Sequence, residues 1–441
     1  MQDVDLIITG SKALLLDEKN TCLNNAALAI NGDKIIAVDD SKKILNQFEA
    51  KKIVEAGNSL IMPGFVNCHT HAAMTCFRGI ADDLELMDWL NNYIFPAEAK
   101  NVNKELAYWG SLLGAAEMIK SGTTTFCDMY IFEDETARAA QEAGIRCLVG
   151  EVLFDFPSPN FKTPGEGVAY TKMLIEKWQD DPLVNIMIEP HALYTCSKPL
   201  LTDVKKLSRE FNVPIGLHLL ENAAEKKQLE EKFGKGAVSF LKDIDYLNEL
   251  LTAFHCVYFS EDDMKMFADH GCKISHNPAS NMKLASGVAP VPEMLKAGVT
   301  VGLGTDGCAS NNNMDMIKEM GTAAKLHKVA RLDPTVMDAQ TVVRMATIEG
   351  AKALGMEKKI GSLEPGKKAD IIVIGLNEPH LTPLYCEYSH LVYAASGADV
   401  DTVIINGKVV MENRNLLTIN EQDVMQKVRE IAVKVKESLK K

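Results

Sequence analysis

The 441-residue sequence lacks several features that would place the chain in a membrane or outside the cell. It has no uninterrupted apolar run of the ~18 residues that a membrane-spanning helix requires. Its first residues, MQDVDLIITG, lack the basic segment and long apolar core of a secretory signal peptide. These absences predict a cytoplasmic protein that does not bind a membrane.

The ten cysteines also lack a recognisable pattern. No C-x-x-C pair occurs among them, which excludes a zinc ribbon and a thioredoxin-like motif. Because a chain of this length can form a full apolar core, disulfides are not needed to stabilise it. We therefore expect the scattered cysteines to be buried free thiols.

Positively charged residues are fewer than negatively charged ones. The 47 Lys and Arg residues against 60 Asp and Glu residues give a formal net charge of −13. A phosphate backbone is bound through an excess of Lys and Arg, so nucleic acid is not an expected partner. With 46% hydrophobic and 24% charged residues, the composition is typical of a globular protein and too apolar for a disordered one.

The glycine fingerprint of dinucleotide-binding sheets, G-x-G-x-x-G, follows none of the predicted strands, and GLGTDG at 302–307 has another spacing. Between about residues 59 and 310, short apolar segments alternate with amphipathic ones, as in a parallel sheet with helical crossovers. The predicted strands are 60–66, 123–129, 145–152, 184–190, 214–220, 251–257, 272–278 and 299–305. This α/β pattern predicts a (β/α)8 TIM barrel rather than a doubly wound sheet.

The two ends of the chain have a different pattern. Both contain short alternating segments separated by turns, and Asn31-Gly32 and Asn406-Gly407 are typical of two-residue hairpins. We therefore predict that residues 1–58 and 369–441 together form a small β-sandwich, with an amphipathic helix at the end of the second segment. Residues 59–368 form the barrel.

Six of the ten histidines lie at or just after the carboxyl ends of predicted strands, where a TIM barrel builds its active site. They are His69, His71, His191, His218, His255 and His276. In an extended segment His69 and His71 project to the same side, so both imidazoles can reach one ion. Taken alone, each motif has an ordinary alternative, such as two chance loop histidines or a buried strand histidine.

Two carboxylates accompany these histidines. Glu221 follows His218 by three residues, and Asp306 lies in the glycine-bordered turn after the last predicted strand. Three imidazoles and one carboxylate, with room for a water, are typical of a catalytic metal site. Such a metal lowers the pKa of its bound water to roughly 7, and neighbouring carboxylates can carry protons. We expect one divalent ion, zinc before iron, cobalt or manganese, which accept the same ligands.

The motifs are similar as an ordered set to those of a known family. PGFVNCHTH, HLLE, FHCV, SHNPASN and GLGTDG together resemble the amidohydrolase superfamily. Within it, FRGIADDLELMDWLNNYIFPAEAK at 77–100 resembles the 5′-methylthioadenosine/S-adenosylhomocysteine deaminase group. The resemblance covers nearly the whole chain, including the two-part sandwich.

The resemblance also implies a role for each site residue. It implies metal ligation by His69, His71, His218 and Asp306. It makes Glu221 the proton carrier, with Asp306 accepting the proton of the attacking water and His255 orienting that water. It places Glu98 and His191 against the nucleoside. By their sequence context alone, Glu98 and His191 would be a solvated helix glutamate and an ordinary strand-end histidine.

One side chain that the group is expected to have is missing. An arginine after the third strand would hold the carboxylate of S-adenosylhomocysteine, but no Arg occurs between Arg146 and Arg209. Gly150 and Glu151 lie near the expected place, and Lys162 is either a substitute or an ordinary loop lysine. Losing a charge-assisted contact weakens a carboxylate-bearing substrate. This favours 5′-methylthioadenosine, 5′-deoxyadenosine or adenosine.

The sequence thus predicts hydrolytic deamination of the adenine ring of a 5′-modified adenosine to the inosine analogue and ammonia. One alternative is another amidohydrolase reaction on a purine, pterin or triazine ring, such as guanine deamination or dechlorination. A nucleoside sensor without turnover and a non-catalytic barrel scaffold are the others. The H-x-E…P-C-x-x-C signature of zinc deaminases that act on polynucleotides is absent. The expected partner is a small nucleoside, and a homo-oligomer is left open.

Overall fold

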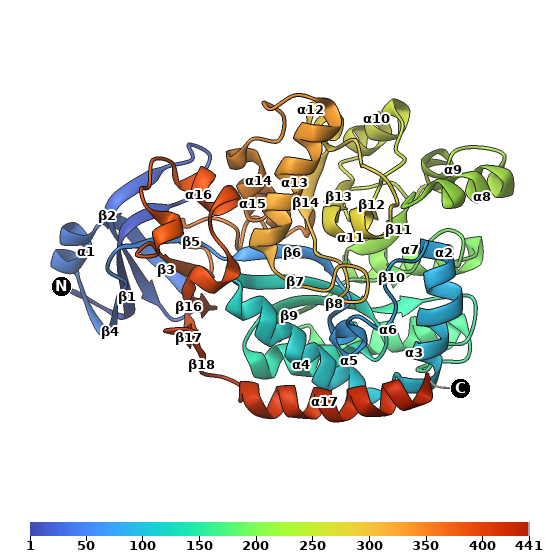
Figure 1. Cartoon of the computed structure of the whole chain (residues 1–441), viewed down its shortest axis with the longest axis horizontal. Helices are drawn as coiled ribbons and strands as arrows, with labels where there is room; N and C mark the ends of the chain where they lie inside the picture. The colour runs from blue at the N-terminus through green and yellow to red at the C-terminus, as the bar shows by residue number, and fades with distance from the viewer. Residues whose placement is uncertain (440–441) are drawn as a thin grey trace.

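The structure, a computed structural model, describes residues 1–439. A β-sheet built from both ends of the chain lies beside a barrel of parallel strands and outer helices (Figure 1). Among the described residues, no helix is both long and apolar enough to cross a membrane. The fold class is the predicted one, a TIM barrel with a β-rich part contributed by the two termini.

The terminal β-part is hydrogen-bonded as one continuous sheet. Its strand order is β18-β17-β16-β15-β5-β1-β2-β3, and β4 pairs with β1 in parallel. Apolar residues of β1, β2, β15 and β16 meet in one buried cluster, which ties the two ends of the chain together. The strands are β1 (Gln2–Leu14), β2 (Cys22–Asn31), β3 (Lys34–Asp40), β4 (Phe48–Glu55), β5 (Ser59–Pro63), β15 (Ile371–Gly375), β16 (Val400–Ile405), β17 (Lys408–Glu412) and β18 (Asn415–Leu416).

Both predicted hairpins are present in this sheet. The antiparallel pair β2–β3 turns at Gly32, which has φ +58°. The pair β16–β17 turns at Asn406 and Gly407, with φ +52° and +78°. Two consecutive residues with positive φ are typical of the type I′ turn, whose twist matches that of the flanking strands.

The barrel strands are parallel within two sheets of hydrogen bonds. One sheet joins β6 to β7, β7 to β8, and β8 to both β9 and β10, and the other has the order β11-β12-β13-β14. Most of their residues are buried, as expected for strands covered on both faces. They are β6 (Phe65–Thr70), β7 (Thr123–Tyr130), β8 (Arg146–Leu153), β9 (Val184–Ile186), β10 (Glu189–Pro190), β11 (Ile215–Leu219), β12 (Leu251–His255), β13 (Lys273–His276) and β14 (Thr300–Leu303).

Backbone hydrogen bonds connect the two parallel sheets at both junctions. At one junction the Ile188 amide donates to the Pro214 carbonyl at 2.9 Å, and the Gly216 amide donates to the Ile188 carbonyl at 3.0 Å. At the other, the Asp306 amide donates to the His69 carbonyl at 2.9 Å. With β9 and β10 taken as one interrupted strand, the ring has the predicted order of eight.

The predicted first barrel strand, 60–66, begins too early in the sequence. Residues 59–63 form β5, which pairs with β1 and β15 in the terminal sheet, and the barrel begins with β6 at Phe65. The apolar run LIMPGFV contains two strands with Gly64 between them, at a place where a Cβ atom would lie 2.1 Å from the Thr124 side chain. The predicted part boundaries at 58/59 and 368/369 stay predictions.

Helices cover the outside of the barrel and follow its strands in the predicted alternation (Figure 1). Those after the second to fifth strands are α5 (Glu133–Ala143), α6 (Pro164–Trp178), α7 (Lys198–Phe211), α8 (Ala223–Phe233) and α9 (Ala237–Asp243). Those after the sixth to eighth are α10 (Glu261–Asp269), α11 (Pro278–Lys283), α12 (Val291–Lys296), α13 (Met316–Arg331), α14 (Ala339–Met345) and α15 (Ile348–Ala353).

The connection after β6 is the long one, and it includes the segment that resembles the deaminase group. It comprises the 3-10 helix η1 (Ala72–Phe77), α2 (Leu86–Asp88), the π-helical turn η2 (Trp89–Ile94), α3 (Phe95–Asn101) and α4 (Lys104–Lys120). The terminal helix α17 (Glu421–Ser438) crosses from the sheet to pack against α4 (Figure 1). α1 (Ser41–Gln47), α16 (Glu387–Tyr393), η3 (Pro379–Leu381) and η4 (Gly397–Asp399) belong to the terminal parts.

All ten cysteines are free, as predicted, and eight are buried. The prediction of burial is wrong for Cys22 and Cys386, which are exposed because they lie where surface elements begin. Cys22 is the first residue of β2, and Cys386 directly precedes α16.

A buried ion pair joins the barrel to the terminal sheet. Arg146, the first residue of β8, donates from Nε and Nη2 to the two carboxylate oxygens of Asp370 at 2.8 and 3.0 Å. Both side chains are only 2% exposed. The Asn406 amide also donates to Asp370, at 2.7 Å. A bidentate ion pair of this kind fixes the relative orientation of the two side chains as well as their distance.

We expect Asp370→Asn to lower the free energy of unfolding by about 3–5 kcal/mol, because it leaves the buried Arg146 charge without its partner. Denaturant unfolding measures the change. Asp203→Asn is the matched control, since its pair with Lys206 is exposed and should contribute about 1 kcal/mol or less. Equal effects of the two substitutions would contradict the role given to the buried pair.

Candidate active site

A cavity lies at the carboxyl ends of the barrel strands. Its floor consists of side chains from strand ends and the loops that follow them, and its wall includes residues of the 86–98 segment. The carboxyl end is where TIM barrels place their active sites. The predicted site residues that border this cavity are His71, Glu98, His191, His218, Glu221, His255 and Asp306.

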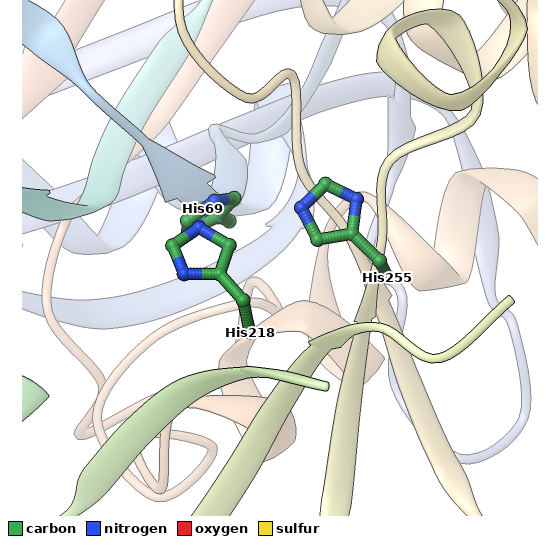
Figure 2. Close-up of side chains that lie close together, drawn as sticks. All are labelled: His69, His218 and His255. Carbon is green, nitrogen blue, oxygen red and sulfur yellow. The ribbon is translucent and has the colours of Figure 1, made fainter. Parts of the chain in front are cut away.

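Three histidines from three different strands gather at the bottom of the site. Figure 2 shows His69 at the end of β6, His218 on β11 and His255 at the end of β12, with their rings turned toward a common space. One ring nitrogen of each lies within 4.8 Å of the others. His69, His71 and Asp306 form a second such group, so His69 is common to both.

His69 is fully buried, and neither of its ring nitrogens has a hydrogen-bond partner. Its ring stacks on Phe254 at 4.0 Å, and the Asp306 carboxylate lies 3.5 Å away, which is long for a hydrogen bond. Burial lowers the pKa of His69 to about 3, so its ring is neutral and has a free lone pair. Because an unpaired buried polar atom is costly, this imidazole fits a metal ligand.

The other imidazoles are oriented through their Nδ1 atoms. His71 Nδ1 bonds to the Met129 carbonyl, and His218 Nδ1 bonds to the His191 carbonyl at 2.9 Å. His71 Nε2 then lies 3.2 Å from Asp306 Oδ1. A backbone carbonyl on one ring nitrogen fixes the tautomer and leaves the other nitrogen to bind an ion.

Asp306 follows β14 in a backbone conformation that non-glycine residues rarely adopt, with φ +63°. Its Oδ2 accepts hydrogen bonds from the hydroxyls of Ser280 at 2.6 Å and Ser310 at 3.0 Å. The Gly307 amide donates to Oδ1 at 2.7 Å. Sequence reasoning missed both serines, although SHNPASN and the residues after GLGTDG contain them.

Glu221 and His255 face each other beside this group. Glu221 is buried, and its Oε1 lies 3.9 Å from His255 Nδ1, which donates a hydrogen bond to Asn281 Oδ1 at 2.8 Å. Burial raises the pKa of Glu221. Glu225 accepts the Glu221 amide at 2.7 Å and so holds the loop that presents it. A carboxyl group with a raised pKa can exchange protons near neutral pH.

Glu98 and His191 both line the cavity. Glu98 on α3 accepts a hydrogen bond from the Tyr130 hydroxyl at 2.7 Å, and burial raises its pKa to about 7. His191 bonds through Nδ1 to the Thr195 hydroxyl at 2.9 Å, and burial lowers its pKa to about 3. Tyr130 and Thr195 are contacts that sequence reasoning did not identify.

The sixth strand-end histidine and Lys162 lie outside the cavity lining. His276 bonds through its Nε2 to His327 Nε2 on α13 at 3.0 Å. Lys162 is exposed and does not border the cavity. Among residues 1–439, none of those that line the cavity is Lys or Arg, and Leu86, Trp89 and Phe154 are among its apolar side chains.

Comparison with known proteins agrees with this geometry. Residues 60–410 match the Amidohydrolase family. The chain is 63% identical over 440 residues to 5-methylthioadenosine/S-adenosylhomocysteine deaminase 1 of Syntrophus aciditrophicus, covering 100% of this chain and 99% of that one. It is 44% identical over 431 residues to a 5'-deoxyadenosine deaminase of Methanosarcina acetivorans, covering 97% and 98%.

A solved structure has the same architecture. An adenosine deaminase from Xanthomonas campestris with bound zinc superposes with a TM-score of 0.97 at 35% identity, over 99% of each chain. The match covers the terminal sheet as well as the barrel. The chain therefore belongs to the amidohydrolase family, and its sequence resembles the 5-methylthioadenosine/S-adenosylhomocysteine deaminases within it, as the motifs predicted.

Proposed function

We propose that this enzyme removes the 6-amino group of adenine from a small 5′-modified adenosine by hydrolysis, releasing ammonia and the inosine analogue. The observation that carries the proposal is the position of buried Glu221 beside His255 and Asp306, next to an unpartnered buried imidazole. This arrangement combines a proton carrier with a metal-ligand set in one cavity. The names of the 63% and 44% identical relatives support the substrate class.

His69, His71, His218 and Asp306 would hold one divalent ion, for which we propose zinc. The ion, when bound, supplies a water of lowered pKa that serves as nucleophile. The absence of any other partner for the His69 nitrogens supports this ligand set, as does the zinc in the Xanthomonas campestris deaminase. His255 belongs to one of the two candidate ligand groups and is assigned here to the water rather than the ion.

The protein side chains then divide the proton transfers. Asp306 accepts a proton from the attacking water, and His255 orients that water toward carbon 6 of the ring. Glu221 donates a proton to ring nitrogen 1, then takes the proton of the new hydroxyl on carbon 6 and passes it to the departing amino group. Return of the Asp306 proton to Glu221 restores both side chains, so that water and the aminopurine become ammonia and the oxopurine. Burial raises the pKa of Glu221, which favours proton exchange by this side chain.

The cavity wall favours a substrate with an uncharged 5′ group. Glu98 would accept hydrogen bonds from ribose hydroxyls through the oxygen that Tyr130 does not use. The absence of Lys and Arg from the cavity lining leaves no cation for a carboxylate tail. 5′-Methylthioadenosine, 5′-deoxyadenosine and adenosine are therefore preferred over S-adenosylhomocysteine.

We expect ammonia release from these three nucleosides when purified, zinc-loaded protein is assayed. The kcat/KM for 5′-methylthioadenosine should exceed that for S-adenosylhomocysteine about tenfold or more, because a charged hydrogen bond contributes about 1.5–3 kcal/mol. Guanine and a chlorotriazine test the alternative reactions. If neither adenosine nor any of its derivatives released ammonia, the proposal would be refuted. A preference for S-adenosylhomocysteine would refute only the argument from the cavity wall.

We expect Glu221→Gln to lower kcat by about 10²–10⁴-fold, because the amide cannot donate and regain the proton. Zinc content, measured by atomic absorption, should remain that of the wild type because Glu221 is not a proposed ligand. Glu231→Gln on α8 is the control, since that side chain is exposed. A Glu221 variant with a near-wild-type rate would show that another group carries the proton.

The affinity for the nucleoside should depend on pH through Glu98. Its pKa is raised to about 7 in the folded protein, so its carboxylate form is lost as the pH falls through 7. Because the carboxylate is the form that accepts ribose hydroxyls, kcat/KM should decrease below pH 7. Glu98→Gln should have a lower kcat/KM without that decrease, measured from pH 5 to 9. Persistence of the same acidic limb in the variant would assign it to another group.

A further inference from the structure

One buried carboxylate near the site takes no part in the proposed reaction. Glu319 lies in the first turn of α13, is 1% exposed and does not line the cavity. Burying a charge-bearing side chain is costly unless it forms good hydrogen bonds. Its partners therefore show what the side chain does there.

Glu319 connects the segments that follow the last two barrel strands. Its Oε1 accepts a hydrogen bond at 2.8 Å from the backbone amide of Ala279, the second residue of α11, which follows β13. Its Oε2 accepts the Asn311 side-chain amide at 3.1 Å, in the loop after β14. Asn311 also donates to the Thr305 carbonyl at 2.8 Å, which ties this loop back to the end of β14.

The residues next to these two contacts are the serines that bind Asp306. Ser280 follows Ala279, and Ser310 precedes Asn311. Both hydroxyls donate to Asp306 Oδ2, at 2.6 and 3.0 Å. Glu319 thus holds each serine through the adjacent residue, and the serines occupy one oxygen of the carboxylate.

The other oxygen of Asp306 faces the histidines. Oδ1 lies 3.2 Å from His71 Nε2 and 3.5 Å from His69 Nε2. Because Asp306 is in a turn with positive φ, no regular secondary structure orients its side chain. The direction of the carboxylate depends on the Gly307 amide and the two serine hydroxyls.

We propose that Glu319 is a positioning residue for Asp306, acting through Ser280 and Ser310. It keeps the two hydroxyls on Oδ2, so that Oδ1 remains the oxygen directed at His69 and His71. The inference rests on the proposed function, in which Asp306 is both a ligand and the acceptor of a proton. A displacement of a catalytic group by about 1 Å can cost on the order of 10²-fold in rate.

Glu319→Gln tests the proposal with little change of shape. The amide keeps one acceptor but presents an NH2 group to a second donor, either the Ala279 amide or the Asn311 side chain. We expect kcat to fall about tenfold to hundredfold, with KM for 5′-methylthioadenosine within about twofold, because Glu319 does not border the cavity. The visible absorption of the Co²⁺-substituted protein should also shift, since it reports the ligand geometry without turnover.

Glu151→Gln is the matched control. Glu151 is equally buried and also accepts one backbone amide, that of Glu133 at 3.0 Å, and one Asn side chain, that of Asn160 at 2.9 Å. The two segments that Glu151 joins, at the start of α5 and after β8, contain no proposed ligand or proton carrier. It should lose a similar amount of thermal stability while kcat and the Co²⁺ spectrum stay near those of the wild type.

A double-mutant cycle tests the path through the serines. Ser280→Ala with Ser310→Ala should lower kcat, and adding Glu319→Gln should lower it little further, because the groups act as a unit. Wild-type kcat and an unshifted Co²⁺ spectrum in Glu319→Gln would overturn the proposal. An equal loss of kcat in Glu151→Gln would also overturn it. So would a triple variant in which the effect of Glu319→Gln on kcat fully multiplies the effect of the two serine substitutions. If the wild type deaminates no adenosine derivative, the proposed function fails, while the Co²⁺ spectra still decide whether Glu319 positions Asp306.

Discussion

The contact between the first and last barrel strands is the constraint on which the site depends. The Asp306 amide donates to the His69 carbonyl at 2.9 Å, and the Asn67 side chain bonds to Thr305 across 238 residues of sequence. These hydrogen bonds bring the carboxylate that follows β14 next to His69 near the end of β6 and His71 just after it. Without this junction, the ligand groups would belong to separate edges of two sheets.

The site concentrates groups that are unfavourable elsewhere in a protein. His69 is buried without a partner, and Glu98, Glu221 and Glu319 have pKa values raised by burial. Such groups persist because the barrel around them is rigid and apolar, and because the loops are held by side-chain hydrogen bonds. Raised carboxyl pKa values and free imidazole lone pairs are also what acid–base and metal-assisted hydrolysis require. The burial that makes these groups energetically costly therefore also gives them the raised pKa values and free lone pairs that the proposed reaction requires.

The periodic features of the sequence predicted the fold well. Alternating apolar segments indicated the strands of the barrel, and Asn-Gly pairs indicated both hairpins, because these signals depend on a few neighbouring residues. The run at 60–66 was misassigned because continuous apolarity does not reveal where one buried strand ends and the next begins. Gly64 lies between the two strands, where a Cβ atom would clash with the Thr124 side chain of β7. This restriction comes from a residue distant in sequence and has no local signal.

The candidate site divides in the same way. The sequence by itself predicted the types of the proposed ligands and their order along the strand ends, and it showed that no arginine follows the third strand. Only the tertiary structure decided that His276 bonds to His327 instead of joining the cluster, and that Ser280 and Ser310 share one oxygen of Asp306. It also decided that Glu319 supports both serines from an adjacent helix. Strand periodicity specifies which residues reach the end of the barrel, whereas the direction of each side chain depends on partners distant in sequence.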